Sequence, residues 1–470
     1  MSLNRISGTC IGGMVMNQRV RIHYPYRITV SVFLCLCLML TACKAEGNVP
    51  INQWNELDLA PDISEMELTA AKLEIWWDDG LGVPHDRYAL EHLKQQYSAT
   101  TFDVQEFTFS YVDTSQNALF NMLRTKSSPD LMVFDSRLLP LLIDIGYLDS
   151  INVSTGYYEM DASVIEQIRS MAPDGELYAM PYGYSPAAVL FNKEIFDEME
   201  VEYPRDGMTW EEVLELGRRV ANPSKWSALL VNDYDLITSQ LSMQLIHPDT
   251  QQVDFESDAW KRLVSFVTEL KLLESEDKRG KLGRITAFAN GRAAMLAVPL
   301  FDNARVESTT GLYTRVMQQD GISDVRWDVV GIPVFDDGLS LAPARPMLMI
   351  GIPRAGLNKN DALIAMQYLL STHVQTENTR QGLISPRVDV ELEEFAKELD
   401  FLSEKNKHAF IRSEQSGKFD LSLDNIPLLD LLIELKTIEG AKEEIKTEVP
   451  QYMDLRNRLI EEVKGKYGWE

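Results

Sequence analysis

The stretch that decides the fold class is Pro129-Asp130-Leu131-Met132-Val133-Phe134-Asp135. The apolar residues between its two aspartates predict a short buried strand. Asp135-Ser136-Arg137 follows, and then an apolar segment that predicts a helix. A buried strand that passes directly into a helix is typical of α/β proteins.

Strands and helices are predicted to alternate on both sides of this stretch. The expected strands are 72–77, 102–109, 177–183, 187–192, 226–232, 295–300, 329–333 and 347–352, and the expected helices include 88–97, 115–123 and 258–273. Thr209 and Glu212 have the spacing of a capping box at the start of a further helix. This alternation favours an α/β fold with a largely parallel sheet.

The composition suits a globular protein with more than one domain. Hydrophobic residues make up 45% of the 470 residues, which is enough for a packed core. A chain of this length is expected to form about two or three domains. The 71 acidic and 45 basic residues give a formal net charge of −26. This acidic balance argues against nucleic-acid binding, which requires a basic surface.

The first 42 residues differ in charge from the rest of the chain, because they contain four arginines and no acidic residue. The apolar residues 28–40 come after the last of these arginines. At 1.5 Å per residue they reach about 20 Å, which is less than the ~30 Å hydrocarbon core of a bilayer. A basic segment followed by a short apolar one predicts a signal peptide over residues 1–42.

Leu40-Thr41-Ala42-Cys43 follows the apolar segment and resembles the lipobox of bacterial lipoproteins. The resemblance implies that Cys43 is lipidated and becomes the new N-terminus. Residues 43–70 carry glycine, proline, asparagine and acidic residues with little periodicity, which predicts a flexible tether. The expected location is the outer face of the cytoplasmic membrane, with the protein held there by its lipid.

Many arrangements that carry catalysis or bind metals are missing from the sequence. All four cysteines lie within residues 1–43, which excludes a disulfide framework, a thiolate metal site and a cysteine nucleophile from the body. The six histidines lack metal-ligand spacing, and there is no P-loop or dinucleotide-binding glycine motif. We expect no metal, cofactor or catalytic residue, although a carboxylate pair suited to glycoside hydrolysis is left open.

Six segments carry a family resemblance, in the same order along the chain. They are Lys72–Trp77, Pro129–Asp135 with Gly146–Asp149, Leu177–Tyr182 with Leu190–Phe196, Met208–Glu212, Ser227–Asn232, and Phe288–Met295. They resemble segments of the extracellular solute-binding proteins of ABC importers, in particular the sugar-binding group that includes maltodextrin-binding proteins. The resemblance covers residues 72–372, and the residues after 372 match poorly.

The resemblance implies a two-lobed periplasmic-binding-protein type II fold, in which hinge strands join two α/β lobes and the ligand binds in the cleft between them. It implies that lobe one holds residues 71–183 and 297–347, and that lobe two holds residues 184–296 and 348–470. It also implies a monomeric binding protein and not an enzyme. Its partners would be a carbohydrate, expected to be an oligosaccharide, and the permease subunits of an importer in the membrane.

The candidate ligand contacts are aromatic and polar residues near the ends of predicted strands, because ligands of open α/β sheets bind beyond the carboxyl ends of strands. They are Trp77, Asp78, Asp79, Asp135, Arg137, Tyr182, Tyr184, Asn232, Asp233, Tyr234, Phe301 and Asp302, together with Arg345 in a loop before a proline. Aromatic rings stack on the apolar faces of a sugar, and carboxylates and amides hydrogen-bond to its hydroxyls.

Structural roles are also open for several of these residues. Trp76 and Trp77 point to opposite faces of one strand, so at least one of them belongs to the core. Asp135 can instead cap the helix that follows it. Tyr182 and Tyr184 share a face if their segment is extended, and they can pack at the hinge instead of contacting a ligand.

Three other functions are open from the sequence. The same fold can bind a polyamine, an iron complex, a peptide or a phosphorylated compound. The chain can be an extracytoplasmic enzyme that acts on a polysaccharide, with two carboxylates flanking the bond that is cleaved. It can also be a sensor that presents its ligand to a signalling receptor, because a fold alone does not establish a function.

Overall fold

The computed structural model describes residues 67–78, 85–107, 118–151, 159–241, 253–275, 283–301, 325–335, 347–412 and 438–469. The chain divides into two compact units, residues 1–49 and 50–470, and every described residue belongs to the second. The expected signal peptide, Cys43, most of the expected tether, Asp79, Asp302 and Arg345 lie outside the described residues. None of the helices in the described part is long and apolar enough to cross a membrane.

The first sheet has the strand order β2-β1-β3-β9-β4 among the described residues. Its strands are β1 (Lys72–Asp78), β2 (Thr101–Phe107), β3 (Leu131–Asp135), β4 (Met180–Tyr184) and β9 (Met347–Gly351). β1 pairs in parallel with β2 and β3, whereas β9 runs antiparallel to both β3 and β4. β1, β3 and β4 therefore end at the same edge of the sheet.

The second sheet has the strand order β6-β7-β5-β8 among the described residues. Its strands are β5 (Ala187–Asn192), β6 (Ser227–Val231), β7 (Ala293–Pro299) and β8 (Trp327–Gly331). β6 and β7 are parallel, and β5 runs antiparallel to β7 and β8. β6, β7 and β8 therefore end at the edge where β5 begins.

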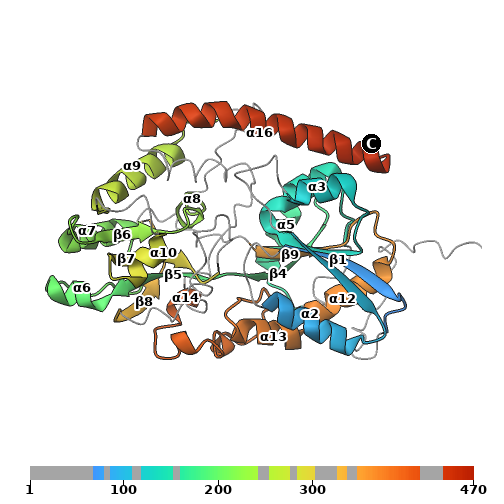
Figure 1. The fold of residues 1–470 in the computed structure, drawn as a ribbon, viewed down its shortest axis with the longest axis horizontal. Coiled ribbons are helices and arrows are strands. Elements are labelled where there is room, and N and C mark those ends of the chain that lie inside the picture. The colour runs from blue at the N-terminus through green and yellow to red at the C-terminus, as the bar shows by residue number, and fades with distance from the viewer. Residues whose placement is uncertain are drawn as a thin grey trace, which may run out of the picture. The chain divides into compact units, whose positions relative to one another are not determined.

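Helices cover both sheets (Figure 1). The α-helices are α2 (His85–Gln96), α3 (Ala118–Thr125), α4 (Leu139–Ile145), α5 (Ala162–Ser170), α6 (Lys193–Glu198), α7 (Trp210–Val220), α8 (Asp235–Thr238), α9 (Asp258–Leu273), α10 (Arg284–Ala289), α12 (Lys359–Leu369), α13 (Thr372–Arg380), α14 (Ala409–Arg412) and α16 (Ile438–Tyr467), and the 3-10 helices are η4 (Ser136–Leu138), η6 (Leu392–Glu394) and η7 (Asp400–Leu402). α12 contacts β3 of the first sheet and the neighbouring helix α2, and α7 and α9 contact β6 of the second sheet.

The helix predicted after Thr209 begins as expected. The Thr209 hydroxyl accepts a hydrogen bond from the Glu212 N–H, and the Glu212 carboxylate accepts one from the Thr209 N–H, which completes the capping box. Trp210 is fully buried, and its ring contacts Phe266 of α9 with 5.2 Å between the ring centroids. The capping box therefore sets the start of α7, and Trp210 joins it to α9.

β5 separates two hydrophobic cores. Ala188 and Leu190 lie in the core that contains the first sheet, whereas Val189 and Phe191 lie in the core under α7 and α9. Successive side chains of a strand point to opposite faces. β5 is therefore buried because one hydrophobic core packs on each of its two faces. This explains why all of β5 is apolar up to Asn192, which caps α6.

α16 contacts both cores. Ile445, Val449 and Met453 are buried in the core of α7 and α9, and Leu459 and Val463 are buried in the core of the first sheet. Figure 1 shows α16 (red) extending from the side of α9 to the side of α3. One helix of 30 residues is thus shared by two cores.

An ionised carboxylate ties β8 to its neighbours. Asp328 accepts hydrogen bonds from the Lys193 ammonium (2.7 Å) and from the N–H groups of Val329 and Asn406 (3.0 and 3.1 Å). Burial alone would raise the pKa of Asp328, but these hydrogen bonds and the charge of Lys193 hold that pKa below its ordinary value. The folded state therefore favours the ionised form of Asp328.

The α/β class and the two-lobed architecture are confirmed, but two expectations differ from the structure. The largely parallel sheet is only partly right, because both sheets are mixed: β9 runs against the other strands of the first sheet and β5 against those of the second in the described residues. The expected lobe boundaries also differ from the strand pairing. β8 pairs with β5 in the second sheet, although 297–347 was expected in lobe one, and β9 pairs with β3 and β4 in the first, although 348–470 was expected in lobe two.

Candidate ligand-binding site

The carboxyl edges of the two sheets meet where β4 passes into β5. Tyr184 is the last residue of β4 and Ala187 is the first residue of β5, so Ser185 and Pro186 alone connect them. Three peptide steps reach at most about 11 Å. The edge at which β1, β3 and β4 end therefore lies next to the edge at which β6 and β7 end, which is the position that favours ligand binding in open α/β sheets.

The edge of the first sheet brings together Asp78, Asp135 and Tyr184, three of the predicted site residues. Asp78 ends β1 and Asp135 ends β3, and the Asp135 N–H donates to the Asp78 carboxylate at 3.4 Å. In the register of the sheet, Asp135 lies opposite Leu348 of β9, and Tyr184 lies opposite Met347. The predicted residues on β1, β3 and β4 thus share one edge.

Asp135 and Arg137 form a buried ion pair. The Arg137 Nε donates to the two Asp135 oxygens at 2.9 and 3.0 Å, and the two side chains are only 5% and 2% exposed. The Asp135 carboxylate also accepts from the Arg137 N–H at 2.9 Å, so it caps η4. The capping role considered for Asp135 is therefore confirmed, and direct ligand contact stays a prediction for both residues.

The edge of the second sheet carries Asn232, Asp233, Tyr234 and Phe301. Asn232 follows β6, and its N–H donates to the Ala297 carbonyl of β7 at 2.8 Å. Phe301 follows β7 and is buried, as is Tyr234. Asn232 and Asp233 are half-buried.

Trp77 and Tyr182 lie in the core. They are 1% and 0% exposed, and their rings meet edge-on with 6.0 Å between centroids. Trp76, on the opposite face of β1, is also fully buried and stacks on Tyr147. Both faces of β1 are thus covered, and among the described candidates Tyr184, Asn232 and Asp233 are the residues that keep partial exposure.

Ser185 is a residue that the sequence reasoning missed. Its hydroxyl donates to the Phe301 carbonyl and accepts from the Phe301 N–H, both at 2.9 Å, and the side chain is buried. The Leu300 N–H donates to the Pro186 carbonyl at 2.8 Å. The connection between the sheets is therefore bound to the end of β7. A Ser-Pro pair between two strands marks a turn and could have drawn attention to it.

A second missed segment, residues 382–384, lies against the same place. The N–H groups of Tyr184 and Ile384 donate to each other's carbonyls at 3.0 and 2.9 Å. A Cβ atom on Gly382 would lie 2.7 Å from Leu300 and 3.5 Å from Phe301. Residues 382–384 thus contact the end of β4 on the first sheet and the end of β7 on the second.

This arrangement can bind a polar solute between the two edges, with Tyr184 at the end of β4 on the first sheet and Asn232 and Asp233 after the end of β6 on the second. Amides and carboxylates accept hydrogen bonds from hydroxyls, and a tyrosine ring offers an apolar face. In the described part of the chain, no three His, Cys, Asp or Glu side chains gather as a metal ion would require.

A family model described as bacterial extracellular solute-binding protein matches residues 92–401, which is more than half of the chain. The matched residues include both sheets except β1. No curated protein has a sequence that matches the chain significantly.

Solved structures share the fold at low sequence identity. An ABC substrate-binding protein from Listeria monocytogenes in complex with cycloalternan is 16% identical, with a TM-score of 0.59, over 85% of this chain and 100% of that one. The sugar-binding protein MalE from Xanthomonas citri is 16% identical, with a TM-score of 0.58, over 84% and 98%. A solute-binding protein from Thermotoga lettingae bound with α-D-tagatose is 16% identical, with a TM-score of 0.57, over 81% and 100%.

Proposed function

Because this chain belongs to the bacterial extracellular solute-binding proteins, we propose that it captures a carbohydrate outside the cell and delivers it to the permease of an ABC importer. The observation that carries the proposal is the meeting of the two carboxyl edges at Ser185 and Pro186, with half-buried Tyr184 at the end of β4 and half-buried Asn232 after the end of β6. We place the ligand between the two lobes, which close around it by a hinge motion at this connection.

The choice of a carbohydrate is supported by what similar proteins bind. The Listeria monocytogenes structure holds cycloalternan, and the Thermotoga lettingae structure holds α-D-tagatose. The residue types at the two edges also suit a sugar, because a tyrosine such as Tyr184 has a ring for stacking and Asn232 and Asp233 have acceptor oxygens for hydroxyls. We propose an oligosaccharide, and we keep Asp78, Asp135, Arg137 and Phe301 as candidate contacts in an open form of the protein.

The lobes of the proposal follow the strand pairing. Lobe one holds the first sheet with α2, α12 and α13, and lobe two holds the second sheet with α7, α9 and α14. We propose that the protein is a monomer that catalyses no reaction, so that a sugar leaves it unchanged. We also propose that Cys43 carries the lipid that holds the protein at the outer face of the cytoplasmic membrane.

The test is a titration of the full-length protein, purified in a detergent that has no sugar head group. Maltotriose, cycloalternan, α-D-tagatose, spermidine and a ferric chelate are added separately, and unfolding is followed in urea. A sugar at 100 times its dissociation constant should stabilise the protein by ~2.7 kcal/mol. Stabilisation by spermidine or the chelate alone would contradict the carbohydrate, and appearance of a shortened sugar would contradict a purely binding role.

The anchor is tested separately. Cells that express the protein are labelled with a palmitate analogue, and the Cys43→Ser variant is the control. Incorporation into the unmutated protein alone supports lipidation at Cys43. Equal labelling of both proteins, or of neither, would contradict it.

A further inference from the structure

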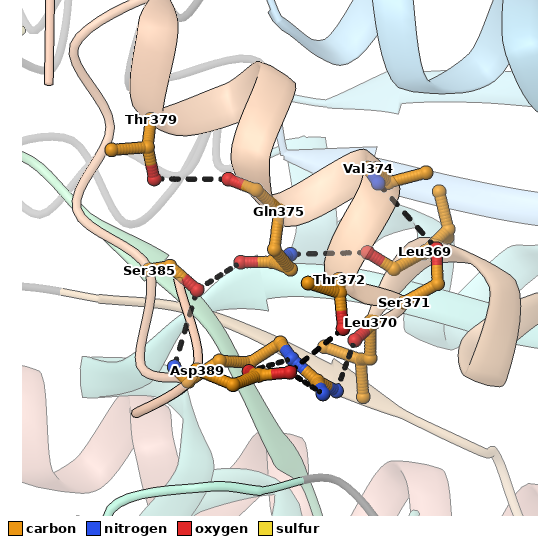
Figure 2. Close-up of polar contacts among 10 residues, drawn as sticks. Leu369, Leu370, Ser371, Thr372, Val374, Gln375, Thr379, Ser385 and Asp389 are labelled. Carbon is orange, nitrogen blue, oxygen red and sulfur yellow. Dashed lines mark hydrogen bonds and ion pairs between the residues drawn. The ribbon is translucent and has the colours of Figure 1, made fainter. Parts of the chain in front are cut away.

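A polar network centred on a buried glutamine joins α13 to residues 385–389 (Figure 2). Gln375 is fully buried at its centre. Its amide nitrogen donates to the Leu369 carbonyl at 3.0 Å, and its amide oxygen accepts from the Ser385 hydroxyl at 2.9 Å. The Ser385 hydroxyl also accepts from the Arg387 N–H at 3.1 Å. Each polar atom of Ser385 and Gln375 in this set has a defined partner, so the network fixes the position of Ser385.

Arg387 anchors the same segment from its other end. Its guanidinium donates to the two Asp389 oxygens at 2.7 Å each and to the Leu370 carbonyl at 2.9 Å. The Thr372 hydroxyl donates to Asp389 at 2.8 Å, so the carboxylate is held from both sides. The Arg387 side chain is only 8% exposed. A planar guanidinium can make these three bonds together, whereas an ammonium group cannot reproduce their geometry.

The segment that this network holds is the one that pairs with Tyr184. Ser385 directly follows Ile384, and the backbones of Ile384 and Tyr184 exchange two hydrogen bonds. β4 is at the edge of the first sheet in the described residues, so Ile384 supplies the outer partner of Tyr184. The close approach of Leu383 to Gly183 leaves no room for a side chain on Gly183. The position of Tyr184 therefore depends on the position of residues 383–385.

We propose that Gln375, Ser385 and Arg387 are positioning residues for ligand capture. Their side chains hold Ile384 against Tyr184, and Tyr184 thereby keeps one orientation at the crossing between the sheets. This inference rests on the proposed function only where it is tested by sugar affinity. Whether Tyr184 is held in place can also be measured by hydrogen exchange without any sugar. If the network only stabilised the fold, its loss would not change sugar affinity specifically through the side chain of Tyr184.

The first test is hydrogen exchange of the full-length protein without sugar, in the unmutated form and in Ser385→Ala. Removing the hydroxyl should speed exchange at the amides of Tyr184 and Ile384 about fivefold to tenfold, because the two hydrogen bonds by which it constrains the segment are lost. The matched control is Ser257→Ala, which removes a serine cap from α9, where the Trp260 N–H donates to Ser257 Oγ at 3.2 Å, and which should leave both amides unchanged. Unchanged exchange in Ser385→Ala would overturn the proposal.

The second test is a double-mutant cycle on affinity, with maltotriose and cycloalternan as probes. Ser385→Ala should weaken binding about fivefold to tenfold in the unmutated background and have no further effect when Tyr184 is already alanine. An equal loss in both backgrounds would overturn the positioning role. Arg387→Lys, which keeps the charge but loses the forked bond, should shift exchange and affinity in the same direction and serves if Ser385→Ala does not fold. If neither probe binds the unmutated protein, the cycle is run with any other sugar that stabilises it, and exchange at Tyr184 still decides the positioning role.

Discussion

Replacing Gly183 with alanine places a methyl group where residues 383 and 384 cross β4. The new Cβ would lie 2.5 Å from Leu383 Cδ2, 2.8 Å from Leu383 Cγ and 3.3 Å from the Ile384 carbonyl oxygen. Leu383 is fully buried, so its side chain must change position within a packed core. Overpacking of this kind costs about 1–3 kcal/mol, and the loss of chain entropy that alanine spares returns about 0.4–1 kcal/mol. The two ranges together leave a net loss of about 0–2.6 kcal/mol in the free energy of unfolding, with a midpoint of about 1.3 kcal/mol.

The assay is urea denaturation followed by tryptophan fluorescence, together with hydrogen exchange at Ile384. The matched control is Gly465→Ala in α16, where a Cβ would meet nothing within 4 Å. A glycine inside a helix costs about 0.5–1 kcal/mol relative to alanine, so this control should stabilise the protein. If Gly183→Ala were as stable as the unmutated protein, with no change in exchange at Ile384, the close contact between residues 383–384 and β4 would be refuted.

Three further predictions concern other contacts. Ser185→Ala removes both hydrogen bonds to the buried Phe301 backbone and should cost about 1–3 kcal/mol in urea denaturation; a loss below ~0.5 kcal/mol would contradict the bond between the connection and β7. The depressed pKa of Asp328 means that its stabilising charge is present above pH ~4 and is lost as the pH falls below this value. Asp328→Asn should therefore lose less stability than the unmutated protein in urea denaturation when the pH is lowered from 5 to 3. Equal losses in the two proteins would contradict this role of Asp328. Leu459→Ala should cost about 2–5 kcal/mol, whereas Leu272→Ala, at a leucine that is 69% exposed, should change stability by less than ~0.5 kcal/mol; similar values for both would contradict the burial of α16.

Much of the local structure could be predicted from the sequence, because its causes are local. The expected bounds of β5 and α9 coincide with those of the structure, since a wholly apolar segment and a strong helical period each identify an element. The capping box at Thr209 was also predictable, because its two partners are three residues apart. The start of β4 differs from the expected one, which was residue 177, because the pairing with β9 begins only at Met180.

The pairing of strands could not be predicted in the same way. β8 and β9 are both short and apolar. The hydrophobic pattern of such a strand does not determine which of two sheets it pairs with. The structure pairs β8 with β5 and β9 with β3, so the chain changes sheet once between them.

The burial of the predicted aromatic site residues has a similar cause. Trp76 and Trp77 are both covered because Tyr147 and Tyr182, distant in sequence, meet opposite faces of β1. The alternation of the strand predicts two faces but does not say which of them is open. For Asp135, the sequence allowed both a cap and a ligand contact, and the cap is observed because Arg137 is close enough to bind it.

The helix α16 has a consequence for biogenesis. Its residues follow every described strand in the chain, and Val449 and Leu459 fill places in two separate cores. During synthesis and export, which proceed from the N-terminus, both cores stay open on one side until α16 has been delivered. A chain cut before residue 438 would therefore expose apolar surface on two domains at once. Proteases and chaperones that recognise exposed apolar surface would therefore find two binding sites on a single truncated chain, one on each core.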